Sequence, residues 1–559
     1  MTSHKIYPAG YAAIDLNISS CGIWDFVFAS KLAAARDSEK IALEQGNTGE
    51  QIRQSLSLKR GDTIAILCPN TLQFVVLALG AQAAGIIVTT VNVAYTAREI
   101  ALQISDSQSS AIFAGPAQLA AAKEAAKIVA LGENKVFMLD SPKETKQSLD
   151  SLLSEDQLVP EHFTPEQARS ETAFMCYSSG TTGKAKGVQS THFNINTNTL
   201  QISGTGEAFV SSDNVLAFLP IFHLFALTAN VLQALYLGSK LVLLPRFDPQ
   251  LVLDTIASKE INAAYIAPPV AMFLAKDPRV KPEGMKSLRW LLSGAAPLGG
   301  EVAAAVQERI GVPTFQGYGL TEMSPAVFMS GPANSREGSV GKLLPNQEAK
   351  LVAPDGSDAD PSVGGEVWLR GPNTMKGYLN RPEETANCID EEGWFHSGDV
   401  ATRDADGFYY IVDRLKDLLK YNGYQVCPSE RRIHLEIALY PLQLAVEAVL
   451  ILHEDVKDAA VRAEIFSALS LPKIGVKKDG NDLPAAFVAL KDGAASSSSS
   501  SKTESEVLAS IDAWFTSQVA PFKRLRAGLF AVKAVPRSAA GKILRKELAI
   551  PTAPAAVTV

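Results

Sequence analysis

The sequence predicts an α/β protein whose large N-terminal part contains several lobes. Between residues 62 and 139, short apolar runs alternate with helical stretches, which is typical of parallel sheets sandwiched by helices. Farther along, the stretches 365–371 and 375–380 suggest a β-rich lobe. The length of 559 residues is more than one hydrophobic core usually supports, so several lobes are expected.

The individual elements follow from the apolar runs and their boundaries. We expect helices at residues 69–84, ended by Gly85, and at 117–129. We expect strands at residues 62–67, 86–91, 111–113, 136–139, 173–177, 215–219, 288–292 and 409–412. Each predicted strand is a short apolar run bounded by polar or turn-forming residues.

Composition and charge exclude several classes of function. A hydrophobic content of 47% and a charged content of 20% are those of an ordinary globular protein. The net charge of −7 argues against a dedicated nucleic-acid binder. The five cysteines are scattered, without a Cys-x-x-Cys pair. This pattern favours a reducing compartment over a zinc site or a disulfide framework.

Targeting signals and membrane spans are not expected. Residues 1–20 contain no continuous apolar core, so we expect no signal peptide. Two uncharged stretches, 63–97 and 214–239, are interrupted by Gly, Pro, Asn or Gln, and we interpret them as buried strands and helices. The final Val-Thr-Val differs from a Ser-Lys-Leu peroxisomal signal. We therefore expect a cytoplasmic protein.

The run Tyr-Ser-Ser-Gly-Thr-Thr-Gly-Lys-Ala-Lys-Gly-Val at residues 177–188 carries the clearest chemical signal. Its glycines let backbone N–H groups approach a ligand, its hydroxyls add donors, and Lys184 and Lys186 add positive charge, which together suit a polyphosphate. A polar surface turn is the alternative. A Walker A loop is excluded, because Gly183 follows Gly180 too closely and Ala185 stands where a hydroxyl is needed.

This run resembles the phosphate loop of the adenylate-forming enzymes, and further motifs follow in the family's order as far as residue 548. Within the family, the likeness is to enzymes of the 4-coumarate–CoA-ligase type, of phenylpropanoid-like secondary metabolism. The resemblance implies that a small-molecule carboxylic acid reacts with ATP and Mg2+, and that the acyl-adenylate then reacts with coenzyme A. It also implies an AMP-binding domain at 1–413, a hinge at 414–420 and a small α+β lid at 421–559.

The resemblance assigns the phosphates, the metal and the adenine to two motifs and a strand end. The residues that would hold the phosphates are Ser178, Ser179, Gly180, Thr181, Thr182, Gly183 and Lys186. The residues that would surround the adenine are Gly294, Ala295, Ala296, Gln316, Gly317, Tyr318 and Gly319. Within the second motif, Tyr318 offers a stacking face, Thr321 a hydroxyl for the α-phosphate and Glu322 a carboxylate for Mg2+.

Other residues match the family's ribose, hinge and lid positions. Asp399 would contact the ribose, and Arg414 would contact the ribose or a phosphate, although a surface salt bridge is the alternative for Arg414. Lys416 matches the hinge, and Lys420 and Gln425 match lid residues that face the active site. Lys542 matches the lysine of the adenylation step in the motif Pro-x-x-x-x-Gly-Lys, where an ammonium would stabilise the in-line attack. A solvated helix lysine is the alternative.

The resemblance also places an acid pocket after the strand predicted at 215–219. The residues that would line it are His223, Phe225, Ala226, Ala229 and Gly317. Hydroxycinnamate ligases tend to carry a tyrosine and a serine where this chain has Phe225 and Ala229. A pocket without these hydroxyls discriminates poorly in favour of a phenolic hydroxyl. We therefore expect an aromatic or medium-chain acid other than 4-coumarate.

Three departures from the family keep three functions open. The segment 41–49 is shorter than the corresponding segment of the family. We interpret residues 431–452 and 462–473 as insertions. Misread splice boundaries would explain all three departures. The serine run 496–501 reads as a flexible loop. The functions are an acyl- or aryl-CoA ligase, favoured because the motifs are intact, an adenylating enzyme with another acceptor, and a nucleotide-binding homologue without turnover.

Overall fold

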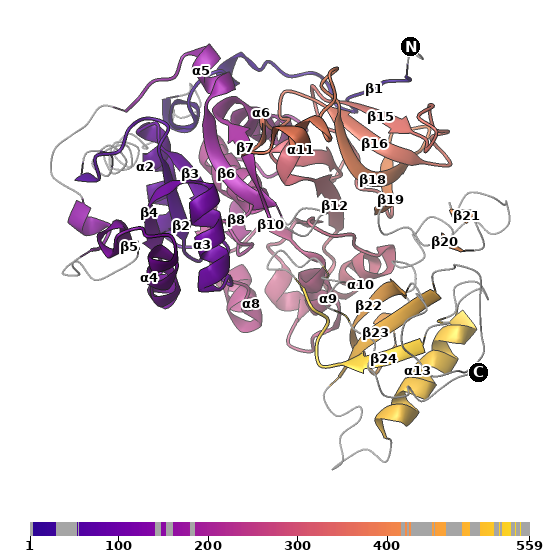
Figure 1. Cartoon of the computed structure of the whole chain (residues 1–559). Coiled ribbons are helices and arrows are strands. Elements are labelled where there is room, and N and C mark those ends of the chain that lie inside the picture. Colours follow the sequence, from indigo (N-terminus) through magenta and orange to yellow (C-terminus); the bar gives the residue numbers. More distant parts are fainter. Residues whose placement is uncertain are drawn as a thin grey trace, which may run out of the picture.

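The computed structural model describes three large sheets and a smaller C-terminal lobe (Figure 1). The described residues are 4–29, 53, 55–139, 147–152, 160–178, 185–414, 420–421, 424–425, 450–451, 453–464, 483–491, 503–518, 525, 528–537, 543 and 548. In Figure 1 the N-terminal sheets, indigo to magenta, lie opposite the orange β-rich lobe and the yellow C-terminal lobe. The predicted α/β class is confirmed.

The first sheet confirms the predicted alternation of strands and helices. Its order is β17-β7-β6-β3-β2-β4-β5. The strands are β2 (Thr63–Leu67), β3 (Ile87–Thr90), β4 (Ser109–Ala114), β5 (Val136–Met138), β6 (Thr172–Ser178), β7 (Lys186–Thr191) and β17 (Gly377–Tyr378). The helices between them are α2 (Leu72–Ala83), α3 (Ala97–Asp106) and α4 (Leu119–Ile128). Helix α2 begins later than predicted because the Thr71 hydroxyl caps it by accepting from Phe74 N.

The second sheet has the order β14-β13-β12-β11-β10-β8-β9. Its strands are β8 (Asn214–Ala217), β9 (Lys240–Leu243), β10 (Ala263–Ile266), β11 (Trp290–Ser293), β12 (Thr314–Gly319), β13 (Ala326–Met329) and β14 (Lys342–Leu343). All neighbours from β9 to β12 run parallel, and β13 and β14 are antiparallel additions. The associated helices are η7 (Phe225–Leu232), α7 (Gln233–Leu237), α8 (Pro249–Ser258), α9 (Pro268–Lys276) and α10 (Gly300–Ile310).

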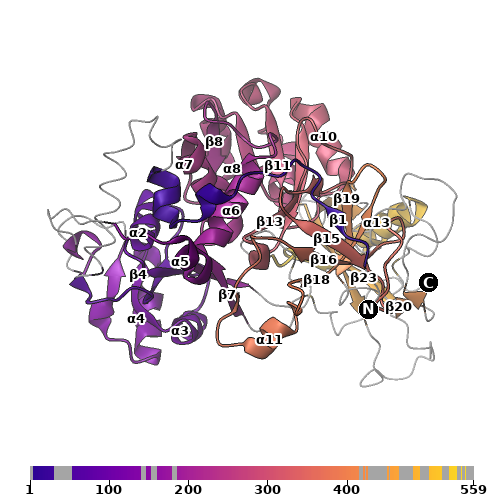
Figure 2. The same cartoon turned by 90° about the horizontal axis from the view of Figure 1, so that it is seen from above.

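Helix α6 (His192–Ser203) joins the first two sheets. It contacts β6 and β7 of the first sheet and β13 of the second, and it lies near the centre of the molecule seen from above (Figure 2). Its polar side chains are buried and bonded: Asn198, for example, accepts from Ala326 N and donates to Ala326 O. A buried polar helix of this kind fixes the relative position of the two sheets.

The third sheet is the predicted β-rich lobe, and it is antiparallel throughout. Its order is β1-β15-β16-β18-β19, with β1 (Tyr7–Pro8), β15 (Glu348–Val352), β16 (Gly365–Arg370), β18 (Phe395–Arg403) and β19 (Tyr409–Arg414). Helix α11 (Pro382–Ala386) precedes β18. The N-terminal segment supplies β1, so the two ends of the N-terminal part meet in this sheet.

The C-terminal lobe contains β22 (Val456–Glu464), β23 (Leu483–Leu490), β24 (Gly528–Val532) and α13 (Glu504–Gln518), and a separate pair joins β20 (Lys420–Tyr421) to β21 (Tyr424–Gln425). Residues 462–464 of the expected second insertion form the end of β22. Residues 450–451 of the expected first insertion are described. The rest of both insertions, the serine run 496–501 and the short segment 41–49 lie outside the described residues.

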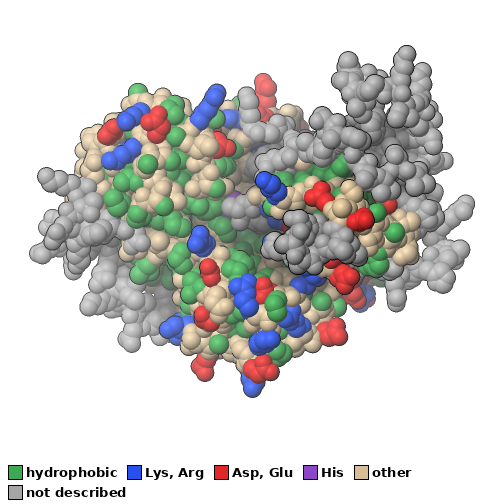
Figure 3. Space-filling model, turned by 90° about the horizontal axis from the view of Figure 1, so that it is seen from below, with side chains coloured by type: hydrophobic (Ala, Val, Ile, Leu, Met, Phe, Trp, Pro, Cys, Tyr) green, Lys and Arg blue, Asp and Glu red, His purple; other side chains and the backbone are tan. Residues whose placement is uncertain are grey.

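Short elements complete the described chain: η1 (Asn17–Ser19), η2 (Asp25–Ala29), η4 (Pro116–Gln118), η5 (Glu133–Lys135), η6 (Asp150–Leu152), α5 (Pro165–Ser170), η8 (Pro282–Met285) and η9 (Thr321–Met323). No helix in the described ranges is long and apolar enough to cross a membrane. On the face shown in Figure 3, acidic and basic side chains of the described residues are interspersed. The described residues of that face therefore form no extended basic surface for a nucleic acid.

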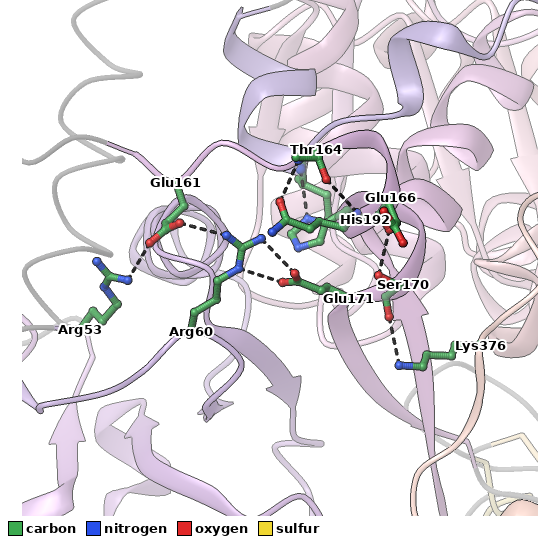
Figure 4. Close-up of polar contacts among 11 residues, drawn as sticks. Arg53, Arg60, Glu161, Thr164, Glu166, Ser170, Glu171, His192 and Lys376 are labelled. Carbon is green, nitrogen blue, oxygen red and sulfur yellow. Dashed lines mark hydrogen bonds and ion pairs between the residues drawn. The ribbon is translucent and has the colours of Figure 1, made fainter.

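A cluster of ion pairs attaches the segment before β6 to the start of β2 (Figure 4). The Arg60 guanidinium donates to Glu171 at 2.9 and 3.1 Å and to Glu161 at 3.1 Å. It also lies 4.2 Å from the centroid of the Phe163 ring. These side chains are partly buried. The cluster therefore ties the start of β6, the strand that leads to the phosphate segment, to the start of β2, which lies on the far side of β3 in the same sheet.

Candidate active site

Predicted site residues lie at the carboxyl ends of three strands. His223 follows β8, Gly294 follows β11, and Tyr318 is near the end of β12. Since β8, β10, β11 and β12 run parallel, their carboxyl ends share one edge, where open α/β sheets bind ligands. At the end of β3, Thr90 Oγ1 donates to Phe222 O at 2.6 Å, which brings the first sheet to the same edge.

The two described ends of the phosphate segment are neighbours. Ser178 closes β6 and pairs with Lys186, which opens β7. The Ser178 hydroxyl oxygen is enclosed and has no hydrogen-bond partner in the described part. Such an orphan donor fits a phosphate oxygen. Five predicted phosphate residues, Ser179, Gly180, Thr181, Thr182 and Gly183, lie outside the described residues.

Glu322 is buried beside this segment. The Tyr378 hydroxyl donates to Glu322 Oε1 at 2.8 Å, and Lys186 Nζ lies 4.6 Å from the centroid of the Tyr378 ring. Burial, followed by the nearby Glu322 carboxylate, raises the pKa of Tyr378. Among the described residues no group of three His, Cys, Asp or Glu gathers for a metal. One carboxylate beside a phosphate segment nevertheless fits Mg2+, which takes most of its ligands from phosphates and water.

The residues predicted for adenine and ribose also meet. The Tyr318 hydroxyl donates to Asp399 Oδ2 at 2.6 Å, although the two residues come from different sheets. Asp399 is 3% exposed and pairs in register with Arg414 on β19. After Tyr318, a side chain on Gly319 would lie 2.2 Å from Pro325 O, so only glycine fits there.

The other predicted adenine residues lie at the ends of β11 and β12. Gln316 pairs in register with Ser293, and its Oε1 accepts from Leu298 N at 3.0 Å, which fixes the loop after β11. In that loop Ala295 has φ +70 and is exposed, and Ala296 is partly buried. Thr321 opens η9 and is partly buried.

The predicted acid-pocket residues form one side of this edge. The Phe225 ring covers Gly294, where an added Cβ would lie 2.9 Å from Phe225 Cζ. Ala226 and Ala229 are buried on the same helix η7. This helix has π geometry, which often occurs at functional sites. Gly317 approaches Phe328 O on the neighbouring strand, where an added Cβ would lie 3.3 Å away.

His223 is a neutral histidine in this structure. Its Nε2 is enclosed without a partner in the described part, and burial lowers its pKa to about 4. Near neutral pH its imidazole therefore carries no charge. Such a ring can donate or accept a hydrogen bond, but it provides no fixed positive charge for a carboxylate.

The remaining predicted residues belong to the hinge and the C-terminal lobe. Lys420 and Gln425 pair with each other through their backbones in β20 and β21. Lys416 and Lys542 lie outside the described residues. The loop that carries Lys542 is fixed at both ends, because Arg537 and Ile543 form a bridge and the Arg537 guanidinium donates to Asp458 at 2.7 and 2.9 Å.

Sequence reasoning missed two parts of the site. Tyr378 falls in the predicted β stretch 375–380, which carries no chemical motif, and Glu384 follows that stretch; both lie close to Lys186. Tyr265 was missed too, although its ring stacks on Phe225 with centroids 5.8 Å apart. None of the three lies in a recognisable motif, so only the tertiary structure identifies them.

Comparison with known proteins shows the family. Residues 47–379 match the family model described as AMP-binding enzyme, which is more than half of the chain. The chain belongs to the AMP-binding enzyme family. The predicted resemblance is thereby confirmed.

Two curated relatives are similar to this AMP-binding enzyme over most of their length. A probable 4-coumarate–CoA ligase 1 of Dictyostelium discoideum is 34% identical over 88% of this chain and 86% of its own length. The 4-coumarate–CoA ligase 2 of Solanum tuberosum is 35% identical over 88% of this chain and 85% of its own length.

Two solved structures share the fold of this AMP-binding enzyme. An anthranilate CoA ligase in complex with anthranoyl-AMP is 22% identical, with a TM-score of 0.78, over 93% of this chain and 95% of that chain. MatB from Rhodopseudomonas palustris with ATP bound is 24% identical, with a TM-score of 0.76, over 94% of this chain and 98% of that chain.

Proposed function

We propose that this AMP-binding enzyme is an ATP-dependent acyl- or aryl-CoA ligase. The observation that carries the proposal is the meeting of Tyr318 with Asp399, and of Glu322 with Tyr378 and Lys186, at the carboxyl edge of the sheets. The pair of Tyr318 and Asp399 suits a nucleoside, and the group of Glu322, Tyr378 and Lys186 suits a polyphosphate with its metal ion. The curated relatives that bear the name 4-coumarate–CoA ligase support the same reaction class.

In the first half-reaction a carboxylate oxygen of the acid attacks the α-phosphorus of ATP. A new phosphorus–oxygen bond forms, the bond to the bridging oxygen of the β-phosphate breaks, and pyrophosphate leaves. Ser178, the residues 179–182 and Lys186 would hold the departing phosphates, and Thr321 and Lys542 would contact the α-phosphate. Mg2+ held by Glu322 and phosphate oxygens would neutralise developing charge. Positioning and electrostatics account for most catalysis in such chemistry.

In the second half-reaction the thiol of coenzyme A attacks the acyl carbon of the adenylate. A carbon–sulfur bond forms, the bond from that carbon to the phosphate oxygen breaks, and AMP leaves while the thiol proton passes to solvent or buffer. We propose the domain division 1–413, 414–420 and 421–559 for this step. A lid that turns about Lys416 would withdraw Lys542 and present Lys420 and Gln425, as in other enzymes with mobile lids.

The acid that we propose is aromatic or of medium chain length and carries no phenolic hydroxyl that needs a partner. The Phe225 ring lies beside Gly294, and Ala226 and Ala229 are buried apolar residues of the same helix η7. Neutral His223 supplies the pocket with one orphan polar atom. A pocket of this composition binds a flat apolar body well. We also propose a cytoplasmic location, which the four described free cysteines support.

The test is AMP release from the purified protein with ATP, Mg2+, coenzyme A and a panel of aromatic and fatty acids. We expect AMP and a thioester that depend on both acid and coenzyme A. We expect Lys542→Ala to reduce the rate at least about a hundredfold, as for loss of a transition-state donor. Acid-dependent pyrophosphate exchange without a thioester would favour another acceptor. ATP binding without AMP would favour a homologue without turnover.

A further inference from the structure

The phosphate-segment lysine is paired with a carboxylate that belongs to neither motif. Lys186 Nζ lies 2.8 Å from Glu384 Oε2. The Lys186 side chain is only 11% exposed, whereas that of Glu384 is 44% exposed, although Oε2 itself is enclosed. The ammonium is therefore screened from water on most sides, and its ion pair is stronger than one on the open surface.

Helix α11 fixes Glu384 in this place. Arg381 Nε lies 3.9 Å from Glu384 Oε1, and Arg381 Nη1 lies 3.2 Å from Asp106 Oδ1. Asp106 in turn accepts from the hydroxyl of Tyr177, the residue before Ser178, at 2.8 Å. The Glu384 carboxylate thus lies between two cations, and the network connects it to the strand that enters the phosphate segment.

We propose that Glu384 acts through Lys186, for which its carboxylate competes with the phosphates of ATP and pyrophosphate. This inference rests on the proposed function, in which Lys186 holds phosphate oxygens. A phosphate that approaches Lys186 must share or displace the carboxylate, and two anions at one ammonium repel each other. Glu384 therefore weakens the binding of both ligands and favours the departure of pyrophosphate.

The test is direct binding of MgATP and of magnesium pyrophosphate to the full-length protein by calorimetry, together with steady-state kinetics. For Glu384→Gln we expect the dissociation constants of both ligands to fall roughly two- to tenfold, the range for loss of one competing charge. The inhibition constant of pyrophosphate should fall by a similar factor, whereas the KM of the acid should not change.

Glu383→Gln is the matched control. Glu383 lies on the same helix, is exposed, and forms no ion pair among the described residues. We expect this variant to bind both ligands as the wild type does. In a Lys186→Ala background, Glu384→Gln should lose its effect on both dissociation constants, because the competition acts through that ammonium.

Weaker or unchanged binding in Glu384→Gln would overturn the proposal; weaker binding would mean that the carboxylate positions Lys186 for phosphates. The same shift in Glu383→Gln would overturn it as well, because the effect would then be one of net charge. A protein that releases no AMP would count against the proposed function alone, since the binding measurements decide the role of Glu384 independently of turnover.

Discussion

Tyr378 shows how one side chain can join two parts of a site. Its hydroxyl donates to Glu322 and its ring faces Lys186, so the predicted metal carboxylate and the predicted phosphate lysine share one scaffold. Replacing an aromatic ring at this place would disturb both neighbours. Tyr378 lies close to Lys186 because it belongs to β17, and β17 pairs with β7, the strand that begins at Lys186.

Buried histidines make the stability of this enzyme depend on pH. His192 Nδ1 accepts from Ile23 N at 3.1 Å, and its ring packs on Phe163 with centroids 4.1 Å apart. Burial, and then the charge of Arg60, lowers the pKa of His192 to about 3. The unfolded chain therefore binds the proton more readily than the folded one, and stability falls as pH decreases from about 6.5 towards 3.

We expect the melting temperature to be lower at pH 5 than at pH 8. His192 alone should lower the free energy of unfolding by on the order of 2 kcal/mol at pH 5. His192→Gln should lower the melting temperature at pH 8, because packing on Phe163 is lost. It should also make the difference in melting temperature between pH 8 and pH 5 smaller. Scanning calorimetry at both pH values measures this. His162→Gln, a change at an exposed histidine, is the control, and an unchanged difference in His192→Gln would contradict the argument.

At the scale of elements, the end of β11 and helix η7 meet at the proposed acid pocket. The chain needs a residue without a side chain at Gly294, because the Phe225 ring occupies the space of a Cβ. Phe225 stacks on Tyr265, and Tyr265 contacts Trp290 in a tilted arrangement with centroids 5.9 Å apart. Because Tyr265 and Trp290 are buried, the Phe225 ring cannot move back without moving them.

We therefore expect Gly294→Ala to raise the KM of the acid about three- to thirtyfold, as a displaced ring narrows the pocket, with a smaller effect on the KM of ATP. Steady-state kinetics with the best acid of the panel measures both. Gly284→Ala is the matched control, because an added Cβ there meets no atom within 4 Å. An equal rise of both KM values in Gly294→Ala would place the change at the nucleotide instead.

At the scale of the whole molecule, the C-terminal lobe contacts the N-terminal part and fixes the ends of the loop that carries Lys542. Lys276 at the end of α9 donates to Ile451 O. Within the lobe, the ion pair of Arg537 with Asp458 ties this loop to β22. Tyr318, which we propose to contact the nucleotide, packs on a core of the N-terminal part, whereas Ile543, the described residue after Lys542, packs on a separate core of the C-terminal lobe.

This separation predicts that Asp458→Asn lowers kcat for AMP formation about three- to thirtyfold and leaves the KM of ATP unchanged. The ion pair positions the loop of Lys542, whereas Tyr318 and Asp399 are untouched. Asp455→Asn, which removes another partly exposed carboxylate of the same lobe, is the control. A change in the KM of ATP without a change in kcat would contradict the proposed place of Lys542 in the reaction.

Much of this architecture follows from local sequence. Alternating apolar runs and helices predict the first sheet, because a strand buried on both faces needs a continuous apolar run. The phosphate segment and the motif from Gln316 to Glu322 predict the chemistry, since their glycines, hydroxyls and carboxylate can be read without a fold. The sequence predicts helix boundaries less accurately than it predicts the helices themselves. Helix α2, for example, is predicted to begin at residue 69 but begins at Leu72, because the Thr71 side chain caps it.

Contacts between distant segments are decided by tertiary structure alone. The sequence determined the class of fold, the family and the residue types of the site, because these depend on local pattern. It did not determine that Tyr318 meets Asp399, that Tyr378 separates Glu322 from Lys186, or that Glu384 pairs with Lys186. Each of these pairs joins different strands or helices, and such pairing is set by how the sheets pack rather than by any nearby residue.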